Sequence, residues 1–255
     1  MKTLAVGNHK GGTGKSATVA ALGEALALVG RRVLMIDADP QATLTQAAGI
    51  ADAEGRSLAE VIGGIQPGTL ALADILRPIA DGLTLAPSDI VLAVSELGLG
   101  QRMGADYVIR RALKGAAGRF DVCLIDCPPT LGRLTVAALT AADGVLVPTQ
   151  PEAAAIRGVS AFLDSIGRVR AELNPGLELL GVVVTMYDSR LNHHRAAVDG
   201  MRAGGVPLMQ SVIGRSVRVA EAALAGQSVV TFEPNGQRAA EYVALAGEVG
   251  VWLDR

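Results

Sequence analysis

The sequence contains few aromatic residues: three phenylalanines, three tyrosines and one tryptophan among 255 residues. Half of all residues are apolar, so the core must be built largely from Ala, Val, Leu and Ile. This composition is typical of a globular fold and excludes a disordered chain. It favours β-branched strands covered by alanine-rich helices.

Cysteine is scarce too. The only two cysteines, Cys123 and Cys127, lie four residues apart with no His or further Cys clustered around them. This spacing does not support a zinc site, and a reducing compartment does not favour a disulfide. We expect both cysteines to be buried thiols.

Long apolar runs are absent as well. The apolar segment from Leu4 to Val6 is too short for the core of a signal peptide, and no run approaches the length of a membrane span. The net charge of −2 gives no overall attraction to nucleic acid or to an anionic membrane, so any such binding requires a local patch. We expect a cytoplasmic protein.

Apolar runs that end in Gly, Asp or Pro alternate along the chain with segments of helical period. Strands are expected at residues 3–8, 32–40, 83–88, 120–129, 144–150, 179–188, 206–213 and 227–234. Helices are expected at residues 15–28, 89–97, 106–113 and 237–252 and between the later strands. This alternation predicts an α/β fold in which a mostly parallel sheet is covered by helices on both faces. Because no linker, charge block or repeat interrupts it, we expect one domain over residues 1–255.

Lysine is rare, with four lysines against nineteen arginines, yet Lys10 and Lys15 both fall in the stretch NHKGGTGKSAT at residues 8–18. A glycine-rich turn between a strand and a helix lets backbone N–H groups and the helix N-terminus face a phosphate. Lys15 would reach the β- and γ-phosphates, and Ser16 would hold Mg²⁺. His9 stands where the general pattern G-x-x-x-x-G-K-[ST] has its first glycine. A flexible turn with incidental lysines is the alternative, which the flanking strand and helix disfavour.

Acidic residues end two of the expected strands. Asp126 closes VCLID, where a phosphate-loop protein places the carboxylate that holds Mg²⁺ through water. Asp37 and Asp39 end the second strand, and a carboxylate near the γ-phosphate can orient an attacking water. Each aspartate alone could be a turn former, but together with the loop they indicate a nucleotide site.

Several motifs in this order and spacing resemble the ParA/Soj group of deviant Walker ATPases and, more loosely, MinD. They are KGGTGKS, IDADPQATLT, FDVCLIDCPP, VLVPTQPE, VVVTMYDSR and VRVAEAALAGQSVVTFEP, and the resemblance runs from about residue 2 to residue 250. It implies the P-loop ATPase fold, ATP and Mg²⁺ as cofactors, and a homodimer that sandwiches two ATP molecules.

The resemblance also implies roles for individual residues. Lys10 of each subunit would reach the phosphates of the other, as an arginine finger does. Asp39 would position water, and Gly11 would permit close approach of the two subunits. The nucleotide would contact Lys10, Gly11, Gly12, Thr13, Gly14, Lys15, Ser16 and Ala17, with Met186 and Asp188 near the base. Gly214 stands where many relatives have a proline thought to line the adenine pocket.

A local cationic patch is expected between residues 189 and 220, which carry five arginines, two histidines and one acid. The patch could simply be a solvated helix face. The resemblance favours DNA contacts, since Arg190 and Arg218 match basic positions of relatives; Arg195 and Arg215 are further candidates. Without aromatic residues to stack on bases, these contacts would go to phosphates of double-stranded DNA regardless of sequence.

The resemblance therefore implies an ATP-dependent switch for DNA segregation or cargo positioning. It would be nucleoid-associated and released when a ParB-like or adaptor partner stimulates a slow ATPase. One alternative is a MinD-like membrane switch, although the tail AAEYVALAGEVGVWLDR lacks a basic amphipathic face and no membrane contact is expected. A metabolic ligase of the same fold, which passes phosphate to a small carboxylate, is another. An iron-protein ATPase would need cysteines on two loops, and both cysteines here lie in one strand. The sequence leaves the cargo open.

Overall fold

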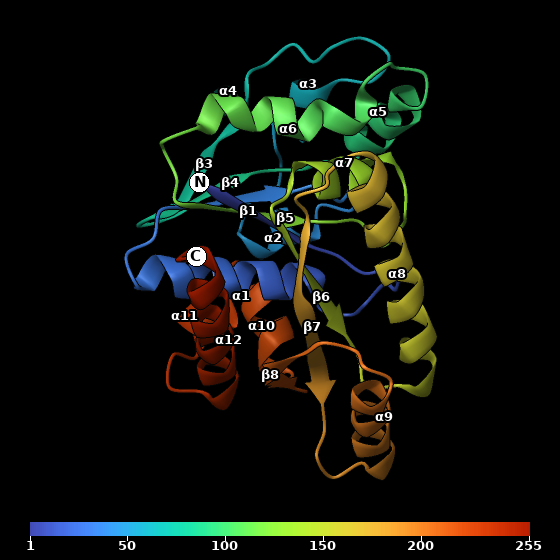
Figure 1. Ribbon diagram of the computed structural model, residues 1–255. Coiled ribbons are helices and arrows are strands. Elements are labelled where there is room, and N and C mark those ends of the chain that lie inside the picture. Colours follow the sequence, from blue (N-terminus) through green and yellow to red (C-terminus); the bar gives the residue numbers. More distant parts are fainter.

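The fold is built on one eight-stranded sheet with the order β3-β4-β2-β5-β1-β6-β7-β8 (Figure 1). This computed structural model describes the chain over residues 1–255, and it describes the side chains of residues 1–152 and 158–255. The strands are β1 (Lys2–Val6), β2 (Val33–Asp37), β3 (Arg77–Ala80), β4 (Leu83–Ala86), β5 (Val122–Asp126), β6 (Gly144–Thr149), β7 (Glu178–Tyr187) and β8 (Leu208–Gly214). All neighbouring strands are parallel except the β3–β4 pair at one edge.

The central strands β2, β5 and β6 are buried along their whole length, which explains their near-continuous apolar sequences. Because β1 pairs with β5 and β6, and β5 with β2, the carboxyl ends of these strands meet at one edge. That edge is where open α/β sheets bind ligands.

Helices cover both faces of the sheet. They are α1 (Lys15–Leu28), α2 (Thr43–Ala47), α3 (Leu58–Ile62), α4 (Leu72–Ile75), α5 (Val91–Leu99), α6 (Val108–Leu113), α7 (Arg133–Ala141), α8 (Ala153–Glu172), α9 (Asn192–Ala203), α10 (Arg218–Leu224), α11 (Val229–Phe232) and α12 (Gln237–Leu253), with 3₁₀ turns at Ala105–Tyr107 and Lys114–Ala116. The predicted α/β fold is thus confirmed.

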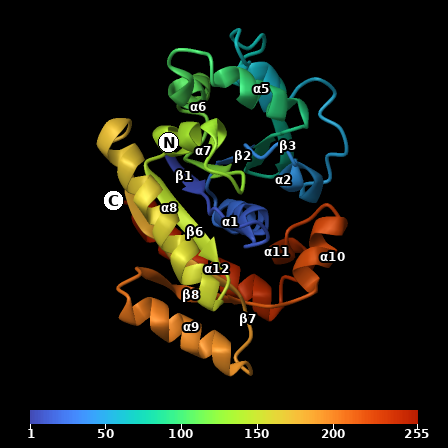
Figure 2. The same ribbon diagram turned by 90° about the vertical axis from the view of Figure 1, so that its right-hand side faces the viewer.

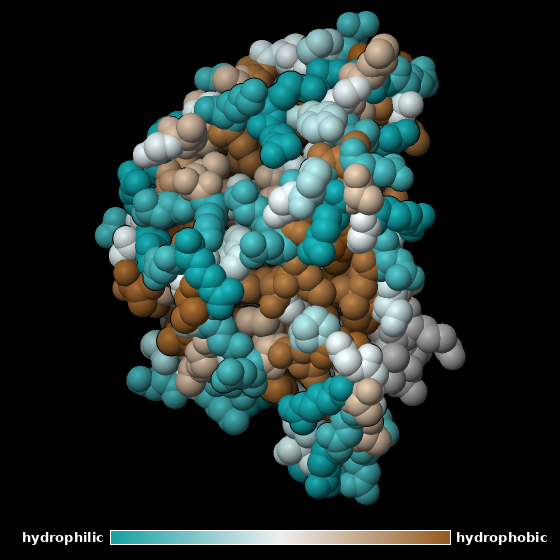
Figure 3. Space-filling model, in the orientation of Figure 1, coloured by the Kyte–Doolittle hydropathy of each residue, from teal (hydrophilic) through white to brown (hydrophobic). Residues whose placement is uncertain are grey.

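Two apolar cores lie on the two sides of the sheet. One contains residues of α1, α2, α11 and α12, and the other contains residues of α3 and of α5 to α8. Figures 1 and 2 show α8 on the opposite side of the sheet from α1 and α12, with α9 at the far end beyond β7. Over the face in Figure 3, apolar residues gather around the middle of the sheet and hydrophilic residues surround them.

The last helix packs on the domain, as its sequence indicated. Tyr242, Leu245, Val249 and Trp252 of α12 are buried against α1 and the sheet. Within the part of the chain that the structure describes, no helix is both long enough and apolar enough to cross a membrane.

One predicted strand is wrong, and one observed strand was not predicted. The segment 227–234 is not a strand: Ser228 caps α11 by accepting a hydrogen bond from the Val230 amide at 3.2 Å. The apolar pair Val229 and Val230 is buried by this short helix instead of by a strand. Strand β3 was not predicted, since its burial alternates along four residues and it forms only the edge of a hairpin that turns at Gly82 (φ 70°).

Candidate functional site

The glycine loop lies between β1 and α1 at the central edge of the sheet. Gly12 and Gly14 have φ values of 72° and 82°, a left-handed conformation that favours glycine. Gly14 caps α1 without a side-chain hydrogen bond, and the first turn of α1 carries no acid. The free N–H groups and the positive end of the helix dipole therefore face the loop, which suits an anion such as phosphate.

Neighbouring strand ends hold this loop in place. The Asn8 side chain donates to the Pro148 carbonyl at 2.7 Å, Gln150 donates to the Gly12 carbonyl at 2.8 Å, and Thr185 donates to the Thr13 carbonyl at 2.8 Å. Asn8, Gln150 and Thr185 were not predicted as site residues. A polar residue at or near the end of an apolar strand could have identified them, since the same pattern identified Asp37 and Asp126. These bonds preorganise the loop before any ligand binds.

The two lysines of the loop point in different directions. Lys15 is buried, and its Nζ donates to the Lys10 carbonyl at 3.3 Å, so it folds back over the loop. Lys10 is half-exposed, and its Nζ lies 2.6 Å from Glu152 Oε2 and 3.3 Å from Gln150 Oε1. Of the two lysines, Lys15 is the one whose ammonium group lies over its own loop.

Asp37 and Asp126 are paired residues on the adjacent strands β2 and β5. Asp37 accepts hydrogen bonds from the Thr45 hydroxyl at 2.7 Å, from the Thr45 amide at 2.8 Å and from the Asp39 amide at 3.1 Å. Burial nevertheless raises the pKa of Asp37 to about 6. With both its oxygens engaged, Asp37 shapes the turn after β2.

Asp126 is buried, and neither of its carboxylate oxygens has a hydrogen-bond partner among the described side chains and backbone. Burial raises its pKa well above the usual value and nearby Asp37 adds to the rise, while the Ser16 hydroxyl and the Lys15 charge oppose it. A buried carboxyl without a partner is costly, so a ligand is expected to complete it.

The residues around Asp126 fit Mg²⁺. Within the described chain, no group of three or more His, Cys, Asp or Glu side chains is arranged to hold a metal. Magnesium needs no such group, because it keeps several waters and is bound through one or two carboxylates together with phosphates. Ser16 at the start of α1 and Asp126 across from it would supply the protein side of such a site.

Asp39 lies just past the end of β2 and is nearly buried. Its Oδ1 accepts from the Gln41 amide at 3.0 Å, and its carbonyl accepts from the Ser88 hydroxyl at 2.8 Å. After burial, the charge of Asp39 adds to the raised pKa of both Asp37 and Asp126, so Asp39 lies near both carboxyl groups. The structure therefore places Asp39 near Asp37 and Asp126, at the carboxyl ends of β2 and β5.

The end of β7 reaches the same loop through Gln150, which donates both to Gly12 and to Met186 Sδ, the latter at 3.0 Å. Met186 has φ 52°, a rare conformation for a side chain of this size that is typical of functional sites. Asp188 is clasped by Arg190, which donates to it at 2.7 and 2.9 Å. This hydrogen bonding lowers the pKa of Asp188.

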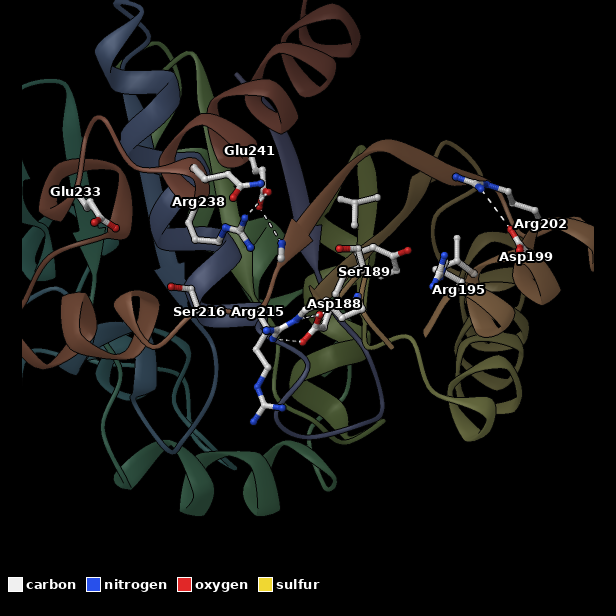
Figure 4. A pocket seen from close by; sticks show the side chains of 16 residues that line it. Asp188, Ser189, Arg195, Asp199, Arg202, Arg215, Ser216, Glu233, Arg238 and Glu241 are labelled. Atoms are coloured by element: carbon white, nitrogen blue, oxygen red, sulfur yellow. Dashed lines mark hydrogen bonds and ion pairs between the residues drawn. The ribbon is translucent and has the colours of Figure 1, made fainter. Parts of the chain in front are cut away.

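The predicted arginines line or flank a cavity of about 790 Å³ beyond β7 and β8 (Figure 4). Arg218 lies 2.8 Å from Glu221 and 3.4 Å from Glu233, and Arg195 donates to Asn192 at 2.8 Å. Within the described residues, the Arg215 side chain has no hydrogen bond or ion pair. The patch is thus less basic than its stretch of sequence indicated, because acids just outside that stretch lie against its arginines.

A parallel sheet with a glycine loop at its centre, a buried lysine over that loop and a carboxyl without a partner define a P-loop nucleotide-binding protein. Residues 1–179 match the family model of the AAA domain. The chain is 42% identical to the chromosome partitioning protein ParA of Caulobacter vibrioides over 253 residues, which are 98% of this chain and 94% of that protein. It is 35% identical to the sporulation initiation inhibitor protein Soj of Bacillus subtilis over 250 residues, 97% of this chain and 98% of that one.

Among solved structures, cobyrinic acid a,c-diamide synthase from Mycobacterium smegmatis is 38% identical with a TM-score of 0.84, over 96% of this chain and 92% of that one. Its complex with an ATP analogue and magnesium has a TM-score of 0.79 at 41% identity, over 89% and 91%. The chain belongs to the ParA/Soj family of P-loop ATPases.

Proposed function

We propose that this protein is an ATP-driven positioning switch. ATP joins two copies, the dimer binds double-stranded DNA without sequence preference, and a ParB-like or adaptor partner stimulates slow hydrolysis and release. The observation that carries this proposal is the opposite placement of two lysines in one loop: Lys15 folds over its own phosphate position, while Lys10 points outward.

ATP and Mg²⁺ are the cofactors of this site, and the metal supplies neutralisation of the phosphate charge. Lys15 and the amides from Gly12 to Ala17 hold the phosphates, and Ser16 and Asp126 hold the metal. Asp39 orients the attacking water. Asp37 takes no direct part, since its oxygens are already engaged by Thr45 and Asp39.

Lys10 acts on the partner's nucleotide. Its ion pair with Glu152 joins side chains that are 43% and 46% exposed, and such a surface pair contributes only about 0–1 kcal/mol. Lys10 can therefore leave Glu152 at little cost when a second copy presents its phosphates. Gly11 agrees with this role. A Cβ at Gly11 would meet nothing within 4 Å in the described part of the chain, so the space beside Gly11 is open to a neighbouring subunit.

DNA binding depends on Arg190, Arg195, Arg215 and Arg218. Two of them are paired with acids, so one copy presents few free charges, and pairing two copies doubles the number on one surface. Contacts of this kind are with phosphates and weaken steeply with salt. Such a protein works as a single domain in the cytoplasm, on the nucleoid, with a chromosome, a plasmid or a protein assembly as cargo.

A second candidate function is an ATP-dependent ligase that passes phosphate to a small carboxylate. It is favoured by the activity named for the similar M. smegmatis structure. A ligase site would need a substrate pocket beside the γ-phosphate and would give no reason for an outward Lys10. A MinD-like membrane switch has less support, because the large apolar residues Tyr242, Leu245 and Trp252 of α12 are buried in the domain.

One experiment separates these functions. DNA binding is measured over a salt series with Mg-ATP, with Mg-ADP and without nucleotide, and ATP turnover is measured with DNA or with small carboxylates plus glutamine. We expect tight binding only with ATP and a linear fall of log K with log salt. Equal DNA affinity in ATP and ADP would contradict the switch, and turnover that requires a small carboxylate would favour the ligase.

A further inference from the structure

The large cavity lies beside the phosphate loop. Gln150 joins Gly12 of that loop to Met186 at the end of β7, and Tyr187 is paired with Gly214 at the end of β8. Because strands lie about 4.8 Å apart, β7 is about 10 Å from β1 and β8 about 15 Å. A nucleotide with its phosphates on the loop would place its base over the ends of β7 and β8, where the cavity opens.

A buried ion pair forms one wall of this cavity (Figure 4). Arg238 lies 2.8 Å from Glu241, and these side chains are only 12% and 20% exposed. Glu241 also accepts the Gly214 amide at 2.8 Å. The guanidinium of Arg238 occupies the space that any side chain on residue 214 would fill, so glycine is required there for room and not for its backbone conformation.

This arrangement is unfavourable unless it has a use. Arg238 lies in the first turn of α12, where the helix dipole disfavours a positive charge, and no acid lies in that turn. Burying an ion pair in place of apolar side chains brings little stability. A residue that breaks such local rules marks a candidate functional position.

The planar guanidinium is suited to stacking on a flat ring. Glu241 fixes its orientation, Gly214 leaves room behind it, and Arg238 still lines the cavity. We propose that Arg238, braced by Glu241 over Gly214, is the stacking surface for the base of the bound nucleotide. The inference rests on the ATP site alone and holds for the positioning switch and for the ligase.

The test compares a nucleotide with a ligand that lacks a base. Affinities for Mg-ATP and for magnesium tripolyphosphate are measured for the wild type and for Arg238→Ala, Arg238→Lys and Gly214→Ala. Stacking predicts that Arg238→Ala weakens ATP binding about 5- to 30-fold and leaves tripolyphosphate binding unchanged. Arg238→Lys keeps the charge without the plane and should lose most of the same effect. Gly214→Ala should displace Arg238 and weaken ATP binding in the same way. The double variant Gly214→Ala/Arg238→Ala should therefore bind ATP no more weakly than Arg238→Ala alone.

Arg202→Ala is the matched control, because Arg202 lines the same cavity but is exposed and, among the described residues, pairs with Asp199 alone. It should change neither affinity. Equal losses for ATP and tripolyphosphate in Arg238→Ala, or no loss for either, would overturn the proposal. A wild-type protein that binds ATP no more tightly than tripolyphosphate would overturn it too, without bearing on DNA binding.

Discussion

At the carboxyl ends of β1, β2 and β5, one lysine and three aspartates are buried, whereas beyond β7 and β8 most ionisable side chains are exposed and paired. We call these regions the phosphate edge (Lys15, Asp37, Asp39, Asp126) and the arginine edge (Arg190, Arg195, Arg215, Arg218). At the phosphate edge, the Asp126 carboxyl has no hydrogen-bond partner among the described residues, and burial holds its pKa well above the usual value. At the arginine edge, Arg190 and Arg218 lie against Asp188, Glu221 and Glu233.

The two edges differ in how their charged groups are stabilised when no ligand is bound. At the phosphate edge, burial of the Asp126 carboxyl lowers the stability of the ligand-free protein. Binding of a metal and phosphates would recover this free energy. At the arginine edge, Arg190 and Arg218 are already paired with acids, so DNA phosphates would have to displace those acids in water. Binding should therefore be strong at the first edge and weak, salt-dependent and additive at the second.

The largest effect is expected from Asp39→Ala at the phosphate edge. This variant should bind Mg-ATP and dimerise, then persist as a dimer, because loss of the residue that orients water should slow hydrolysis about 10²- to 10⁴-fold. Phosphate release with partner present, together with sedimentation, measures both. Asp89→Ala is the control, since Asp89 follows β4 but has no role in the account; an Asp39→Ala protein with wild-type turnover would refute the assignment.

Charge reversal at the arginine edge should have the next largest effect. Arg218→Glu would gather three acids with Glu221 and Glu233, and Arg190→Glu would face Asp188. Each should weaken DNA binding at least about 10-fold with ATP-dependent dimers intact. Fluorescence anisotropy with a DNA duplex checks this, with exposed Arg56→Glu as the control. Unchanged DNA affinity in both reversals would move the interface elsewhere.

Asp126→Asn should act in opposite directions on stability and on binding. Without nucleotide it replaces a buried ionisable group by a neutral one, so the melting temperature should rise by roughly 2–4 °C, which corresponds to about 1 kcal/mol. Its Mg²⁺-dependent ATP affinity should fall, as should that of Asp126→Ala. Calorimetry with and without Mg-ATP measures the melting temperature and the ATP affinity. A lower melting temperature for ligand-free Asp126→Asn would contradict this prediction, because it would mean that the Asp126 carboxyl makes stabilising interactions in the ligand-free protein.

The smallest effects sharpen the view of the arginine edge. Arg218→Ala should reduce the slope of log K against log salt by roughly 2 per dimer, about one phosphate contact per subunit. Glu233→Gln should do the reverse and raise DNA affinity a few-fold, since it frees Arg218 from one acid. An unchanged slope in Arg218→Ala would mean that Arg218 does not contact DNA phosphates.

The phosphate edge could be predicted residue by residue because its signals are local. Glycines, lysines and strand-ending aspartates were read directly from the sequence, and the parallel sheet brought them together. The arginine edge could not, since Glu233 and the Arg238–Glu241 pair reach it through the packing of α12 on β8 and of α11 on α12. The short helix α11 was predicted as a strand because Val229 and Val230 are apolar and β-branched. The Ser228 side chain caps this segment as the start of a helix instead.

The most direct measurement is sedimentation of Lys10→Ala and Lys15→Ala, each with Mg-ATP, alongside nucleotide titration of both. The account predicts that Lys10→Ala binds ATP but stays monomeric and shows no stimulated hydrolysis, because only the partner's phosphates lose a cation. Lys15→Ala should instead lose ATP affinity itself, since its Nζ lies over its own loop. A Lys10→Ala protein that dimerises normally on ATP would contradict the role of Lys10 across the dimer and, with it, the proposed switch.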